Sequence, residues 1–189
     1  MPTVRRCALC LLLLISGCVP NYTPPKHPTG TLQNEITIDK SFQEVWSAVI
    51  DHATSTFFGV ENFEKDSGLM TLSFGGRNTD RFIDCGWLKT TNLANYDGTT
   101  VQALEREALS TNLVGRMNIV VRAETPSRTR LRANARYVYQ VQGKQYKPTW
   151  TFESNTSDTQ KVGSVMVTCR ATNAAEQDLL KGVTVRLAK

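Results

Sequence analysis

The chain has 189 residues, of which 40% are hydrophobic and 21% charged, and this is the composition of a globular protein with room for one ordinary domain. Its formal charge is +5, but two of its 22 basic residues, Arg5 and Arg6, belong to an N-terminal segment without acids, so the rest carries 20 basic and 17 acidic side chains. Nucleic-acid binding is not indicated, because it usually requires a concentrated basic patch.

The N-terminal residues follow the three-part plan of a secretory signal, with Arg5 and Arg6, an apolar run over residues 7–15 and then small residues. The run is too short for a transmembrane helix, which needs about 20 apolar residues. It ends in Ile-Ser-Gly-Cys at residues 15–18, where an ordinary signal would end in an Ala-x-Ala-like site.

This tetrad resembles the lipobox of bacterial lipoproteins. The resemblance implies that residues 1–17 are a signal peptide and that Cys18 is the lipidated first residue of the mature chain, carrying a diacylglyceryl group and an amide-linked acyl chain such as palmitate. Several acyl chains hold a protein stably in a membrane. By the same resemblance, Val19 in place of Asp indicates the periplasmic face of the outer membrane. The alternative is a non-lipidated signal with a chance cysteine.

Residues 18–34 contain four prolines and are expected to be an extended tether without helix or strand pairing. A folded domain is expected over residues 35–189. It begins with a short strand at 35–38, followed by an amphipathic helix at 42–56 whose start carries a capping box, Ser41 with Glu44.

A hairpin follows, with strands at 60–64 and 69–74 around a Lys-Asp-Ser-Gly turn. Residues 75–115 are rich in turn formers and are expected to be a long excursion, which could carry function or be a tolerated insertion.

Alternating strand patterns return over residues 117–124, 129–142, 145–154 and 164–170, and Asn173 with Glu176 can cap a closing helix. The predicted fold class is therefore α+β, an antiparallel sheet with a long N-terminal helix and a short C-terminal helix on one face.

Residues 36–74 carry a capped helix containing Val45-Trp46, a strand, the sequence Asp-Ser-Gly-Leu at 66–69 and another strand. This run resembles the opening of the helix-grip domains in the family of the C component lipoprotein of the outer-membrane β-barrel assembly machinery. The resemblance implies a helix-grip-like fold and brings no catalytic residues with it.

The expected folded part keeps two cysteines, Cys85 and Cys169, and in an oxidising periplasm they are expected to form a disulfide. The alternative is a pair of unpaired buried thiols. No histidine or CxxC motif accompanies them, so no metal site and no cofactor are expected.

Four arginines, Arg128, Arg130, Arg132 and Arg136, fall on even positions of the predicted strand 129–142 or just before it, so they share one face. They are candidates for contact with an anionic partner, such as lipid phosphates, lipopolysaccharide or an acidic protein surface. The alternative is an ordinary solvated sheet face.

No catalytic sequence motif is present, and His52 is the one histidine of the expected folded part. The sequence therefore favours a non-enzyme, held in the membrane through Cys18, that binds or scaffolds an envelope protein partner through the excursion or the arginine face. The rival hypothesis is a hydrolase of envelope polymers whose acids meet only in the fold.

Overall fold

The computed structural model describes residues 21–26, 33–76, 78–90 and 95–188. Its helices are α1 (Phe42–Thr54), α2 (Thr79–Phe82), α3 (Thr100–Glu107) and α4 (Ala174–Leu187). Its strands are β1 (Asn21–Thr23), β2 (Glu35–Ile38), β3 (Gly59–Glu64), β4 (Leu69–Gly75), β5 (Ile83–Asp84), β6 (Trp87–Thr90), β7 (Tyr96–Thr99), β8 (Ser110–Thr125), β9 (Arg128–Gln142), β10 (Thr149–Glu153), β11 (Ser157–Val162) and β12 (Val165–Ala171). The antiparallel α+β class predicted from the sequence is confirmed.

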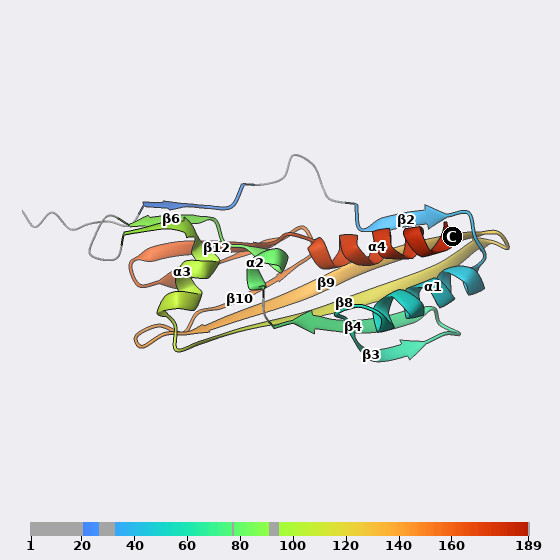
Figure 1. Cartoon of the computed structure of the whole chain (residues 1–189), viewed down its shortest axis with the longest axis horizontal. Helices are drawn as coiled ribbons and strands as arrows, with labels where there is room; N and C mark the ends of the chain where they lie inside the picture. The colour runs from blue at the N-terminus through green and yellow to red at the C-terminus, as the bar shows by residue number, and fades with distance from the viewer. Residues whose placement is uncertain (1–20, 27–32, 77, 91–94, 189) are drawn as a thin grey trace, which may run out of the picture.

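The main sheet has six strands in the order β10-β9-β8-β4-β3, with β2 added along β9. Strands β8 and β9, of 16 and 15 residues, form one long hairpin that runs through the elongated molecule (Figure 1). β2 pairs with the first part of β9 and β10 with its last part, so two short strands share one edge of β9. Three-stranded sheets, β1-β6-β7 and β11-β12-β5, complete the other end.

Helices α1 and α4 cover the face of the main sheet on which β9 places Leu131, Ala133, Ala135, Tyr137 and Tyr139, all of them buried. α1 forms as predicted from its capping box. The Ser41 Oγ accepts from the Glu44 amide, and the Ser41 amide donates to Glu44 Oε2 at 3.0 Å. Its buried residues include Val45, Trp46 and Val49. The helix ends at Thr54, two residues before the predicted end.

The closing helix differs from its prediction. With 14 residues against 13 in α1, α4 is not short. Asn173 does not cap it through its side chain, because the side chain is buried and bonded to Asn155. The buried Glu176 instead accepts hydrogen bonds from the hydroxyls of Tyr137 and Ser154, at 2.6 and 2.5 Å, which fixes the start of α4 on the sheet.

The predicted excursion, residues 75–115, is not a long loop. It contains α2, β5, β6, β7 and α3 and the first residues of β8. These elements are short. β6 and β7 pair locally, whereas β5 pairs with β12 and β6 pairs with β1, two strands that are distant in sequence.

The expectation that residues 18–34 lack strand pairing is wrong for residues 21–23. β1 pairs with β6, with Tyr22 opposite Leu88. The Tyr22 hydroxyl also donates to the Thr168 carbonyl oxygen at 3.1 Å and accepts from the Thr168 amide at 2.9 Å. Residues 21–23 are therefore part of the folded structure.

Candidate functional site

Cys85 and Cys169 form a disulfide with a sulfur–sulfur distance of 1.99 Å, as predicted, and both are buried. Cys85 directly follows β5, and Cys169 lies in β12 next to the two residue pairs that join these strands. The bridge therefore fixes the first part of the excursion to the last strand. Cys18, the predicted lipidation site, lies outside the described residues.

The predicted arginine row is exposed on the sheet face opposite the helices. It is wider than the sequence indicated, because β8 adds Arg116 and Arg122 to the same face. We call this set the arginine face: Arg116, Arg122, Arg128, Arg130, Arg132 and Arg136.

Two cross-strand pairs in the arginine face join like charges. Arg116 lies opposite Arg136, and Arg122 lies opposite Arg130. Directly opposed like charges destabilise a strand pair, so these positions need compensating anions.

Carboxylates around the arginine face provide part of this compensation. Arg116 forms an ion pair with Glu61 at 3.0 Å, and Arg130 forms one with Glu124 at 3.3 Å. The remaining pairs are longer, at 3.7–4.0 Å: Arg128 with Asp39 and Glu124, Arg130 with Glu35, and Arg132 with Glu35. Within the described part of the chain, Arg122 and Arg136 have no ion pair.

A shallow hollow of about 260 Å³ lies within the arginine face. It is lined by Arg132, Arg136, Asn118, Asn134, Ala135, Glu153 and Ser154. Two guanidinium groups and one carboxylate leave it with a net positive charge, and its amide groups offer further hydrogen bonds to an oxyanion.

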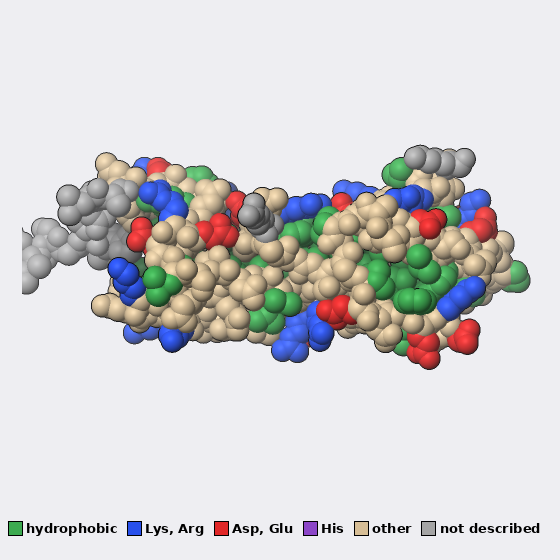
Figure 2. Space-filling view, turned by 60° about the horizontal axis from the view of Figure 1, so that its bottom comes forward, with side chains coloured by type: hydrophobic (Ala, Val, Ile, Leu, Met, Phe, Trp, Pro, Cys, Tyr) green, Lys and Arg blue, Asp and Glu red, His purple; other side chains and the backbone are tan. Residues whose placement is uncertain are grey.

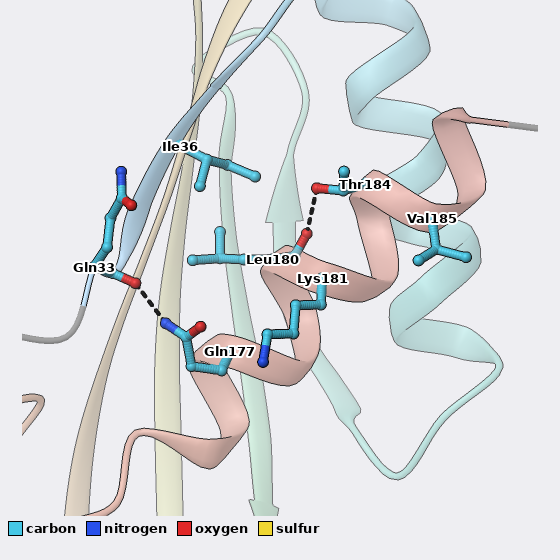
Figure 3. A pocket seen from close by; sticks show the side chains of 7 residues that line it. All are labelled: Gln33, Ile36, Gln177, Leu180, Lys181, Thr184 and Val185. Atoms are coloured by element: carbon cyan, nitrogen blue, oxygen red, sulfur yellow. Dashed lines mark hydrogen bonds between the residues drawn. The ribbon is translucent and has the colours of Figure 1, made fainter.

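A groove on the opposite side of the molecule runs between β2 and α4 (Figure 3). Ile36 and Leu180 point toward each other across it, and Gln177 bridges it by donating to the Gln33 carbonyl oxygen at 2.5 Å. Its volume is about 260 Å³. Lys181 and Val185, the latter 60% exposed, line both this groove and a second hollow, whose lining also includes His52 and Asp178.

His52 is the described histidine that a hydrolase would use, and it is buried between α1 and α4. Its Nε2 lies 3.2 Å from Asp178 Oδ2, while the other oxygen of Asp178 accepts from Arg81 at 3.2 Å. Gly182 presses against the ring, since an added Cβ would lie 2.0 Å from His52 Cε1. The His52–Asp178 pair is thus part of the packing between the helices, with its carboxylate already neutralised by Arg81.

An apolar surface borders β3, the edge strand of the main sheet. Val60 and Phe63 stand opposite buried Leu72 and Met70, on the same side as α1, yet they are exposed, Phe63 by 59%. Figure 2 shows hydrophobic side chains gathered over the half of the molecule that holds α1 and β3.

None of the described helices is long and apolar enough to cross a lipid bilayer. Among the residues that the structure describes, no three His, Cys, Asp or Glu side chains gather to form a metal site.

Comparisons with protein-family models, with curated proteins and with solved structures found no match to this chain. The resemblances drawn from Cys18 and from residues 36–74 therefore stay predictions.

Sequence reasoning missed the β8 arginines and the groove along α4. Arg116 and Arg122 follow the same alternation as the β9 row and could have been found by aligning the two strands of the hairpin. The groove had no comparable signal, because it depends on how β2 and α4 approach each other.

Proposed function

We propose that this protein is a lipoprotein of the periplasmic face of the outer membrane, anchored through Cys18, whose helix-grip-like sheet binds a protein partner within an envelope assembly. The observation that carries the binding role is that two pairs of arginines lie directly opposite each other on β8 and β9, next to a positively charged hollow. Four neighbouring carboxylates, Glu35, Asp39, Glu61 and Glu124, pair with four of the six arginines. The surface is therefore suited to an acidic protein segment that supplies the missing anions.

The geometry favours a binding surface over a hydrolytic site. Arginine guanidinium groups form bidentate hydrogen bonds with carboxylates, and the paired strands β8 and β9 hold these arginines in a fixed register. The positive electrostatic potential of the arginine face also accelerates association with an acidic partner, and this acceleration weakens as salt is added.

The binding role is tested in cells by placing a photo-crosslinking benzoylphenylalanine at Asn118, which lines the hollow and is exposed. We expect an adduct with one envelope protein through an acidic segment. The double variant R132E/R136E should lose the adduct, because it reverses both guanidinium charges. The matched control K144E/K147E changes the charge equally at exposed positions between β9 and β10 and should keep it.

An adduct that survives R132E/R136E, or one that contains only lipid, would contradict the proposed protein partner. The anchor is tested separately by Cys18→Ser with palmitate labelling. We expect a soluble or uncleaved product without label. If Cys18→Ser fractionates with the membrane as the wild type does, the lipid anchor is refuted. The binding role of the arginine face is tested independently by the crosslinking experiment.

A further inference from the structure

An apolar cavity lies beneath the excursion, at the end of the molecule that holds β1. It has a volume of about 320 Å³, within the range of small-molecule sites. Its walls come from β6, α3, the β11–β12 hairpin and the loop after β9: Leu88, Thr90, Thr100, Leu104, Tyr146, Val162, Gly163, Ser164, Val165 and Val167. Aliphatic side chains dominate this lining, so the cavity suits an aliphatic ligand.

One polar group in the wall has no partner. Thr100 is 2% exposed, and its Oγ1 makes no hydrogen bond to any described residue. A buried hydroxyl without a partner costs about 1–3 kcal/mol. The oxygen itself is out of contact with the cavity space, so the surface that a ligand meets at Thr100 is apolar.

The cavity lies close to the predicted lipidation site along the chain. Tyr22 in β1 pairs with Leu88, which lines the cavity, and Asn21 pairs with Lys89. Cys18 precedes Asn21 by three residues, a reach of about 10 Å in extended chain. Lys89, the partner of Asn21, is followed by Thr90, which also lines the cavity.

We propose that this cavity takes one fatty acyl chain, held by the aliphatic side chains of its lining. The source of the chain rests on the proposed lipid anchor: it is either the acyl group on Cys18 or that of a neighbouring membrane lipid. Binding of an acyl chain as such does not require lipidation and can be measured without it.

The first experiment uses the full chain with Cys18→Ser, so that no attached acyl group competes. Dibromostearate quenches tryptophan fluorescence over short distances. Trp150 lies directly behind the cavity wall, because its indole donates at 2.9 Å to the carbonyl oxygen of Val167, which lines the cavity. We expect saturable quenching that palmitate reverses. Absence of saturable quenching would overturn the proposal.

Matched variants locate the binding. Val165→Phe fills the cavity and should weaken dibromostearate binding at least tenfold, whereas Met166→Phe, on the other face of β12 and 56% exposed in the wild type, should leave it unchanged. If Val165→Phe does not fold, Thr90→Phe narrows the cavity from a half-buried position on β6. Equal affinity in the cavity-filling variant and its control would refute the site.

A second experiment identifies the source with the lipidated wild type in nanodiscs. Quenching by brominated phospholipid assigns the chain to a neighbouring lipid. If neither brominated phospholipid nor added dibromostearate quenches the tryptophan fluorescence, the bound acyl chain is the one on Cys18. If added dibromostearate binds the lipidated protein as tightly as it binds Cys18→Ser, neither source fills the cavity and the proposal fails, while the anchor itself can still stand.

Discussion

The Cys85–Cys169 bridge makes a quantitative prediction about stability. The two residues are separated by 84 positions, and in the chain-entropy model a loop of this size stabilises the folded state by about 4–5 kcal/mol. Domains of ordinary size are stable by about 5–15 kcal/mol, so the double variant C85A/C169A should lose a large part of its free energy of unfolding. Alanine is the suitable replacement, because serine would bury unpaired hydroxyls at both positions.

The structure also predicts where the loss is concentrated. β5 and β12 share two paired positions, Asp84 with Arg170 and Ile83 with Ala171, so the bridge is the strong link between the excursion and the last strand. Hydrogen exchange in α2, β6 and α3 should therefore accelerate more than exchange in α1, which is held by the main sheet.

The measurement is urea unfolding of the full chain carrying Cys18→Ser, in its oxidised form, in its reduced form and with C85A/C169A added. The reduced protein and the double variant should unfold at similarly lower urea concentrations. Two free thiols in the denatured, unreduced protein, or a loss below about 1 kcal/mol, would refute the reasoning.

Two further predictions concern the sheet and α1. Burial raises the pKa of Tyr137, with a further contribution from Glu176, and burial also raises the pKa of Tyr139. Since the unfolded chain loses these protons near pH 10, the free energy of unfolding should fall above that pH by about 1.4 kcal/mol per pH unit for each tyrosine. Tyr139→Phe removes a hydroxyl without a hydrogen-bond partner, so it should reduce this slope without loss of stability at pH 7. An unchanged slope, measured by urea unfolding at alkaline pH, would show that Tyr139 does not contribute to the pH dependence. Ser41→Ala removes the capping box, so the free energy of unfolding should fall by about 1 kcal/mol in urea unfolding. The pKa of Glu44, which is lowered by its hydrogen bonds to Ser41, should rise in an NMR titration. The control Ser47→Ala, in the middle of the helix, should show neither change.

The elements predicted well from the sequence are those whose cause is local. Ser41 and Glu44 are three residues apart, so their capping box could be read directly. The alternation in β9 separates exposed Arg130 and Arg132 from buried Leu131 and Ala133 over its whole length, which gives a strong strand signal.

The elements predicted poorly depend on distant partners. β1, β5 and β6 have two to four residues each, too few for a periodic signal, and are held by pairing across the sequence. Tyr22 bonds to Thr168, 146 positions away. Asn173 has the residue type and spacing of a helix cap, but its side chain is buried and hydrogen-bonds to Asn155 instead. Local chemistry cannot predict which of these competing partners wins.

The docking of β1 changes what the proline-rich segment can do. β1 lies at one end of the molecule and β2 toward the other, so residues 24–34 connect two parts of the folded structure and cannot all serve as a spacer from a lipid (Figure 1). Arg170 donates to the Lys26 carbonyl oxygen at 3.1 Å and holds the start of this connection. Two residues, Val19 and Pro20, separate Cys18 from Asn21 in the sequence, so a lipid on Cys18 could lie at most about 10 Å of extended chain from β1. Arg130 and Arg132 lie opposite β2 in the sheet, so this part of the arginine face is at the end of the molecule away from β1. A lipid held next to β1 would therefore leave the arginine face away from the anchor point and open to a partner that is not anchored beside Cys18.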